Sequence, residues 1–106
     1  MTLEALLNQM KDEGIGGAVV RVDGVQVAST IALNDVSSGL LALVSNSSDA
    51  LMKKMGDQQK ELEISFGDQI LVMVPIDDHV FCGLVKSREE KKTVLAYAQK
   101  AKGFLK

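Results

Sequence analysis

The stretch that decides the fold is GGAVVRVDGVQVAS, residues 16–29. It holds two runs rich in β-branched residues, 18–22 and 25–29, which are joined by Asp23-Gly24. An Asp-Gly pair between two such runs is a strong signal for a β-hairpin, and both residues tolerate the positive φ angles of a type I′ turn. The sequence therefore predicts a two-stranded antiparallel hairpin here.

A short helix is predicted immediately before this hairpin. Its apolar residues recur at the spacing of one helical face: Leu3, Leu6, Leu7 and Met10. Thr2 is placed to cap its first turn and Gly14 to end it. The glycine-rich residues 14–17 follow a helix and open a strand, whereas a phosphate-binding loop follows a strand and opens a helix. We therefore expect a close approach of helix to sheet here, and no nucleotide site.

The second half of the chain predicts three strands in close succession. Residues 61–66 alternate between polar and apolar, residues 69–74 are almost continuously apolar, and residues 79–85 return after Asp77-Asp78. Gly67-Asp68 supplies the other tight turn. Tight turns make sequential strands antiparallel neighbours, so the strands predict an antiparallel sheet.

Two further helices are expected. One covers roughly residues 36–55, begins at Asn34 or Asp35 and ends at Gly56. The last helix opens with a capping box in which Ser87 and Glu90 satisfy each other's backbone amides. Its inner face is formed by Val94, Tyr97, Ala98, Ala101 and Leu105. The order α-β-β-α-β-β-β-α predicts an α+β fold in which helices cover an antiparallel sheet, in a single domain over residues 1–106.

The composition limits the classes of function. The chain has 106 residues, a net charge of −2 and a sequence pI near 5.3, so it lacks the basic excess typical of nucleic-acid-binding proteins. Its single cysteine, Cys82, rules out an internal disulfide. The longest apolar run, residues 70–76, is far short of the roughly 20 residues that span a bilayer, and the N-terminus has no signal-peptide pattern. We expect a cytoplasmic protein that neither binds nucleic acid nor inserts into a membrane.

No arrangement of residues in the sequence indicates catalysis or metal binding. His79 and Cys82 lie three positions apart on a predicted strand, so their side chains point to opposite faces and do not form a nucleophile–base pair. We expect an exposed histidine in a turn and a buried thiol. Asp77, Asp78 and His79 are adjacent, and adjacent side chains splay apart instead of converging on one ion. The sequence thus predicts no catalytic residue, no metal and no cofactor.

The strand over residues 61–66 is expected at an edge of the sheet. Leu62 and Ile64 share one face, and Glu61, Glu63 and Ser65 share the other, which we expect to be solvated or to face a partner. A regular edge strand without Pro or Lys in its centre is unprotected against pairing with another chain. Pairing with its own copy about a two-fold axis removes that liability.

The predicted middle helix carries no charged residue between positions 36 and 48. One stripe on it is suited to packing on the sheet: Leu40, Leu43, Val44, Ser47 and Leu51. A second stripe of mostly small residues comprises Ser38, Ala42, Ser45, Asp49 and Met52, and Leu41 lies between the two. A helix that packs only on its own sheet normally has a charged outer face, and an exposed apolar face marks an interaction site. The alternative is that the chain's own termini cover this face.

Taken together, the hairpin and the helix after it resemble the roadblock / dynein light-chain superfamily. The shared motif is a glycine, an aliphatic strand, Asp-Gly and a strand ending in Ala-Ser, here Gly17, residues 19–22, Asp23-Gly24 and Ala28-Ser29. The resemblance implies a five-stranded antiparallel sheet sandwiched between one long middle helix and two terminal helices. It also implies a homodimer with one ten-stranded joint sheet, made by antiparallel pairing of the middle helices and of the third strands.

Carried onto this chain, the resemblance places the dimer interface on two segments: Ser38, Leu41, Ala42, Ser45, Asp49 and Met52 of the helix, and Leu62, Glu63, Ile64 and Ser65 of the strand. It implies a non-enzymatic scaffold or regulator whose partner is a small Ras-like GTPase. One alternative is a structural adaptor subunit of a larger motor or signalling complex, with no dependence on nucleotide. Another is a small hydrolase or ligand sensor, for which His79 and Cys82 are the only candidate residues.

Overall fold

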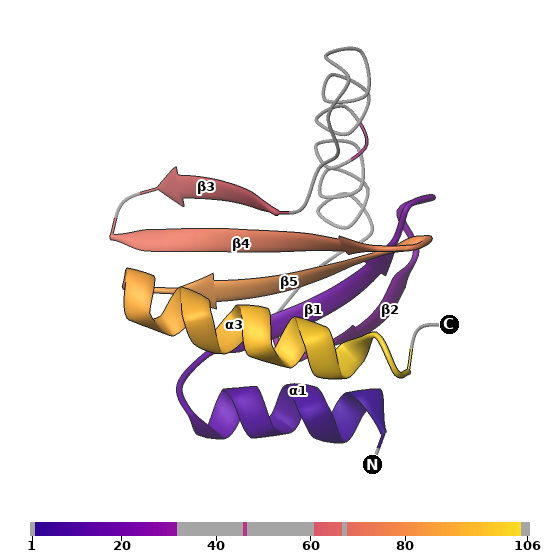
Figure 1. Cartoon of the computed structure of the whole chain (residues 1–106), viewed down its shortest axis with the longest axis horizontal. Helices are drawn as coiled ribbons and strands as arrows, with labels where there is room; N and C mark the ends of the chain where they lie inside the picture. The colour runs from indigo at the N-terminus through magenta and orange to yellow at the C-terminus, as the bar shows by residue number, and fades with distance from the viewer. Residues whose placement is uncertain (1, 32–45, 47–60, 67, 105–106) are drawn as a thin grey trace.

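The computed structural model describes residues 2–31, 46, 61–66 and 68–104. Within them a five-stranded, wholly antiparallel sheet has the order β2-β1-β5-β4-β3, as Figure 1 shows. In chain order the elements are α1 (Leu3–Asp12), β1 (Gly16–Arg21), β2 (Gln26–Ser29), β3 (Leu62–Phe66), β4 (Gln69–Ile76), β5 (His79–Val85) and α3 (Arg88–Ala101). The predicted α+β class and five-stranded antiparallel sheet are confirmed. The predicted helix over residues 36–55 lies outside the described residues, apart from Asn46, which is helical.

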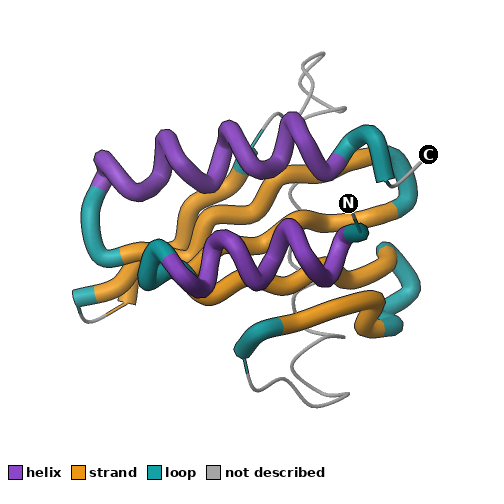
Figure 2. Tube along the Cα trace, turned by 90° about the horizontal axis from the view of Figure 1, so that it is seen from below, coloured by secondary structure: helices purple, strands orange, loops and turns teal. Residues whose placement is uncertain are grey.

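Both terminal helices lie side by side on one face of the sheet, and the two chain ends lie at the same end of the molecule (Figures 1 and 2). The apolar stripe of α1 and that of α3 meet the sheet in the first core cluster, which contains Leu6, Met10, Val19, Phe81 and Val94. Burying such side chains stabilises the fold by about 1.5–3 kcal/mol each. A second cluster lies on the opposite face, formed by Ala18, Val20, Met73, Val80 and Cys82. The sheet is therefore buried on both faces.

Helix α1 has the caps that its sequence predicts. The hydroxyl of Thr2 accepts a hydrogen bond from the Ala5 N–H at 3.1 Å. At the other end Gly14 has φ +82°, a left-handed conformation in which glycine is unstrained. The N–H groups of Gly14 and Ile15 donate to the carbonyls of Lys11 and Met10, both at 2.9 Å. This pair of bonds is a Schellman motif, which ends the helix and turns the chain into β1.

The β1–β2 hairpin is present, but the predicted turn type is wrong. A type I′ turn requires positive φ at both central residues, and at this tip only Gly24 has it, at +93°. The Gly24 N–H donates to the Arg21 carbonyl at 2.9 Å, and the Arg21 N–H donates to the Val25 carbonyl at 2.8 Å. These bonds close a three-residue loop, and Asp23 adds an Asx contact to the Val25 N–H at 3.2 Å. Asp-Gly therefore predicted the hairpin correctly and its loop length wrongly.

Strand β5 is the central strand of the sheet, with β4 beside it, and β4 is two residues longer than predicted. β4 continues to Ile76 through Pro75, which has no N–H to donate. Proline is accepted there because β3 begins opposite Met73, so Pro75 lies beyond the end of its neighbour. The β4–β5 turn has Asp77 at φ +52°, a position that Asp tolerates better than most residues.

Helix α3 opens at Ser87, as predicted, with the Ser87 hydroxyl accepting from the Glu90 N–H at 3.3 Å. The capping box is not reciprocal, because the Glu90 carboxylate accepts from the N–H of Lys86 at 2.9 Å, one residue earlier than expected. Further along, α3 packs closely on Gly83 of β5: a Cβ at that position would lie 2.6 Å from a methyl carbon of Val94. Gly17 of β1 is approached in the same way by Leu7 of α1, as the glycine-rich residues 14–17 predict.

Candidate interaction surface

Strand β3 is an edge of the described sheet, because β4 is its one neighbour in the strand order. Its pairing with β4 runs without a bulge from Leu62 opposite Met73 to Phe66 opposite Gln69. Five residues in unbroken register expose a straight row of backbone donors and acceptors on the outer side. The expectation that this strand forms a sheet edge is confirmed.

The two faces of β3 differ sharply in character. Leu62 and Ile64 are half-buried against the second core cluster, next to Met73 and Leu71 of β4. Glu63 and Ser65 point to the face that carries the terminal helices, and Ser65 is exposed. The alternation read from the sequence is therefore correct, and the apolar side of the edge belongs to the core of the domain.

The charged side of this edge is held by helix α3 instead of being simply solvated. The ammonium of Lys91 lies 2.8 Å from the Glu61 carboxylate and 3.0 Å from that of Glu63. Arg88, one helical turn earlier, lies 4.0 Å from Glu63 and is largely exposed. The two carboxylates raise the pKa of Lys91 above its ordinary 10.5, first through the hydrogen bond to Glu61 and then through that to Glu63. The face that we expect to be solvated or to face a partner thus carries an ion-pair cluster, which we call the β3 clamp: Glu61, Glu63, Arg88 and Lys91.

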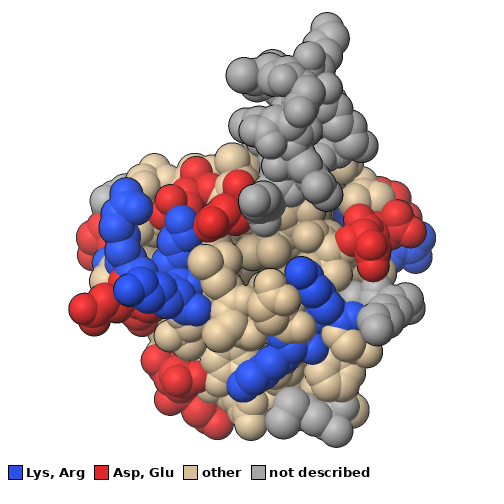
Figure 3. All heavy atoms as spheres, in the orientation of Figure 1, with Lys and Arg blue, Asp and Glu red and all other residues tan. Residues whose placement is uncertain are grey.

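Acidic and basic side chains intermingle in the same region of the surface, over the β3 end and the start of α3, at the upper left of Figure 3. The side chain of Lys91 is only 19% exposed, and that of Glu63 only 27%. These two groups are therefore screened by solvent less than a surface ion pair normally is. The sequence places the basic residues Arg88 and Lys91 on one turn of a helix, which is a signal for half of the clamp. Only the fold shows that Glu61 and Glu63 lie against them.

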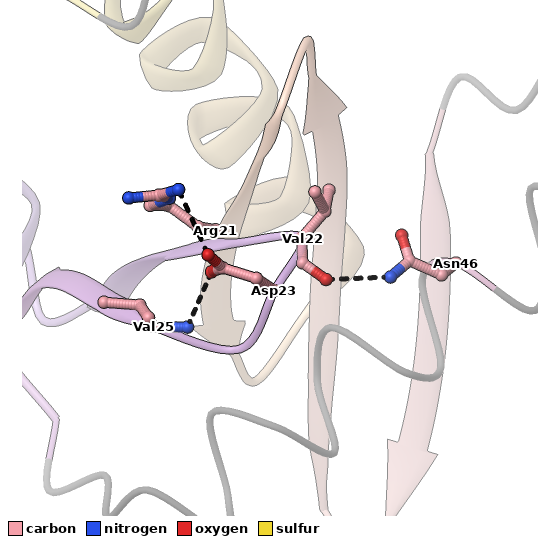
Figure 4. Close-up of polar contacts among 5 residues, drawn as sticks. All are labelled: Arg21, Val22, Asp23, Val25 and Asn46. Atoms are coloured by element: carbon pink, nitrogen blue, oxygen red, sulfur yellow. Dashed lines mark hydrogen bonds and ion pairs between the residues drawn. The ribbon is translucent and has the colours of Figure 1, made fainter.

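The helix half of the predicted interface comprises six residues of the segment that follows the β1–β2 hairpin in the chain. Ser38, Leu41, Ala42, Ser45, Asp49 and Met52 all lie outside the described residues. Asn46, from the same segment, is described and exposed. Its side-chain amide donates to the Val22 carbonyl at 3.0 Å, so it contacts the tip of the β1–β2 hairpin (Figure 4). The hairpin tip is also tied to the β4–β5 turn, because the Val22 N–H donates to the Asp78 carbonyl at 2.9 Å.

Neither of the two candidate catalytic residues, Cys82 and His79, is arranged for covalent chemistry. Cys82 is fully buried in the second core cluster, and burial raises the pKa of its thiol from 9.0 to about 12. A thiol with such a pKa is protonated at neutral pH and is a poor nucleophile. His79 is half-buried instead of exposed as expected, and its Nδ1 has no hydrogen-bond partner in the part of the chain that is described. The predicted burial of the cysteine is confirmed, and the predicted exposure of the histidine is wrong.

In the described ranges, no three His, Cys, Asp or Glu side chains gather closely enough to hold a metal ion. A pocket of about 170 Å³ lies between α1 and β2, where Glu4, Asn8 and Ser29 contribute its polar wall. Small-molecule sites usually enclose roughly 300–1,000 Å³, so this hollow is small for one. Likewise, no helix among the described residues is long and apolar enough to cross a bilayer.

The arrangement of the sheet and the terminal helices defines a fold class. No family model matches the sequence, and no curated protein matches it significantly. Solved structures do match: the chain superposes on a Roadblock/LC7 domain from Streptomyces avermitilis with a TM-score of 0.78 and 11% identity, over 99% of this chain and 98% of the other. The roadblock-like fold that the sequence resembles is therefore confirmed.

Two further structures have the same fold. The gliding protein MglB from Thermus thermophilus superposes with a TM-score of 0.72 and 20% identity, over 95% of this chain and 83% of that one. Profilin IB from Acanthamoeba castellanii superposes with a TM-score of 0.68 and 14% identity, over 98% of this chain and 96% of that one. At these identities the similarity establishes the fold, which roadblock domains and profilins share, and leaves function to the residues of the surface.

Proposed function

We propose that this chain is a non-enzymatic, homodimeric scaffold or regulator that binds a partner protein, namely a small Ras-like GTPase. The observation that carries the proposal is the open, regular edge at β3, whose Leu62 and Ile64 continue the second core cluster up to the edge. Antiparallel pairing of two such edges about a two-fold axis joins two five-stranded sheets into one of ten strands. The helix residues from Ser38 to Met52 complete this interface in the proposal.

Among the described residues, Cys82 and His79 are not arranged as a nucleophile and its base, which supports a binding role over catalysis. Cys82 is buried and protonated at neutral pH, and His79 has no partner that orients it within the described part of the chain. The fold supports the proposal as well, because the resemblance to roadblock proteins implies that the chain acts as a partner of a small GTPase. A structure described as "MglB with tetrameric arrangement", which shares 19% identity and a TM-score of 0.72 with this chain, shows that another protein of this fold assembles from several copies.

Light scattering across a dilution series tests the dimer. A mass near twice the chain's 11.4 kDa is expected at micromolar concentration. A monomer at every concentration would contradict the homodimer, and the charge-free helix segment would then need another partner.

A binding assay against small GTPases tests the partner. Each GTPase is loaded with GDP or with a non-hydrolysable GTP analogue and titrated with the dimer, with the label on the GTPase. We expect binding that differs between the two nucleotide states, because the switch loops of such GTPases differ in order between them. Equal binding in both states would favour the adaptor role, and absence of binding in either state would contradict a GTPase partner.

A further inference from the structure

The β3 clamp lies where the proposed dimer would bring two copies together. A two-fold axis perpendicular to the joint sheet keeps each face on its own side, so residues that oppose each other across the axis share a face. Glu63 of one copy must therefore oppose Glu61, Glu63 or Ser65 of the other. The charges on this face consequently influence which register forms.

Only one register pairs every residue of β3 with a residue of the other β3. With Ile64 on the axis, Ile64 opposes itself, Glu63 opposes Ser65, and Leu62 opposes Phe66. With Glu63 on the axis, two carboxylates face each other directly, which destabilises a sheet, and Phe66 finds no partner within the strand. The length of β3 and its charges thus favour the same register.

Even in that register the two Glu63 side chains are diagonal neighbours, roughly 7–8 Å apart at the backbone, which is within a Debye length at physiological salt. Each copy would bring its Glu63 carboxylate to the seam, where the two Glu63 carboxylates would repel each other, while Glu61 lies beyond the paired residues of β3. Lys91 contacts both carboxylates of its own copy at 2.8 and 3.0 Å, and Arg88 approaches Glu63 at 4.0 Å. Two cations therefore balance two anions within each copy, before any pairing takes place.

We propose that Lys91, assisted by Arg88, neutralises the β3 edge so that a second copy of this chain can pair with it in the register that has Ile64 on the two-fold axis. The inference rests on the proposed homodimer and adds to it a positioning residue, outside the interface strand, that controls assembly. A modification that removes the charge of Lys91 would accordingly weaken the dimer.

The charge is tested with Lys91→Gln, using Lys91→Arg as the conservative control. Sedimentation equilibrium at low salt is expected to show a dimer dissociation constant about ten-fold higher for Lys91→Gln and close to the original for Lys91→Arg. Near 1 M salt, where the Debye length is about 3 Å, the Lys91→Gln dimer should recover, because repulsion is then screened. Adding Glu63→Gln to Lys91→Gln should restore it at low salt too. A merely structural role for Lys91 predicts neither recovery.

The register is tested by oxidative cross-linking of Ile64→Cys and, as a matched control, Glu63→Cys. The native Cys82 is buried, so the introduced thiol is the one available to the oxidant. Ile64→Cys should give a covalent dimer and Glu63→Cys should not; the reverse result would overturn the register. A Lys91→Gln dimer that is as tight as the original, within about two-fold, would overturn the role of Lys91 while leaving the homodimer intact. A wild-type chain that is monomeric throughout would overturn both proposals.

Discussion

The described sheet has two edges, and they are built differently. β2 has four residues, and a bulge interrupts its pairing with β1, where Ala28 opposes Val19 but Gln26 opposes Val20. β3 has five residues in unbroken register with β4. Bulges and short length are the usual means by which a protein protects an edge from pairing with other chains. One edge of this sheet is thus closed to association and the other is open.

If exposed apolar area alone decided which edge associates with another chain, it would favour the β2 edge. The β2 edge is the more apolar on its surface, because Val27 in β2 is 40% exposed and Val25, just before β2, is 53% exposed. β3 has its apolar residues turned into the second core cluster and its carboxylates held by Lys91. Regular backbone geometry, more than exposed apolar area, therefore distinguishes the edge that we expect to assemble.

The largest effect is expected from a negative charge placed on each edge in turn. Ser65→Glu should abolish the proposed dimer at micromolar concentration, because in the proposed register residue 65 opposes Glu63 of the second copy and like charges would meet on both sides of the axis. Gln26→Glu is the matched control, since Gln26 is also exposed, polar and on an edge strand. Its solution mass by light scattering should not change.

Ser65→Lys separates this electrostatic effect from a steric one. A lysine at position 65 would face Glu63 of the second copy, so the dimer should persist. If Ser65→Lys and Ser65→Glu dissociate the dimer equally, the charge argument fails. If Gln26→Glu dissociates it instead, the assembling edge is β2.

A smaller effect, of about 1–2 kcal/mol in the free energy of unfolding, is expected from Gly24→Ala. Gly24 has φ +93° at the tip that joins β2 to β1, and a Cβ is strained in that conformation. Urea denaturation at a concentration where the chain is wholly monomeric measures the loss. Gly103→Ala is the control, because φ there is not positive and a Cβ would make only an ordinary 3.5 Å contact. Equal stability of the two variants would show that the tip relaxes freely.

Asn46→Ala should cost about 0.5–1.5 kcal/mol, towards the lower end because the contact is exposed. The variant loses the bond from the Asn46 amide to the Val22 carbonyl, and with it a link between the hairpin tip and residue 46. Hydrogen exchange at the Gly24 and Val25 amides reports the change locally. Faster exchange at these amides, with that of β3 unchanged, is the expected result; an equal change at both edges would contradict a local role.

Local sequence signals predicted the parts of this fold that depend on neighbours in the chain. Thr2, Gly14 and Ser87 acted as caps, and Asp23-Gly24 turned the hairpin, because each acts within a few residues of itself. The loop length at Asp23-Gly24 was not predicted, since several hairpin loops accept the same pair.

The missed features all depend on contacts between distant segments. The β3 clamp joins residues 61 and 63 to residues 88 and 91, and no sequence period relates them. The need for a glycine at position 83 could not be predicted, because it arises from the close approach of Val94 in α3. The half-buried position of His79 follows likewise from its place opposite Arg21 of β1, not from its place in a turn.

The smallest expected effect is a loss of stability at alkaline pH that is greater at the β3 edge than at the β2 edge. The pKa of Lys91 is raised above 10.5 by Glu61 and Glu63, so the folded state holds this proton more tightly than the unfolded chain. The stability from the clamp is therefore fully present below pH 10.5 and is lost as the pH rises through the folded-state pKa. Exchange at β3 should accelerate over that range more than exchange at β2.

Two other groups also titrate in alkali, so the comparison needs a control that isolates Lys91. The pKa of Tyr97 is raised, chiefly by its hydrogen bond to Glu13, and that of Cys82 is raised to about 12 by burial. Deprotonation of either group therefore also lowers the stability of the fold as the pH rises. Lys91→Arg keeps these two groups and replaces the titrating ammonium by a guanidinium that stays charged. The alkaline loss at β3 should be smaller in Lys91→Arg than in the original chain; identical profiles would mean that the clamp contributes nothing to holding the open edge.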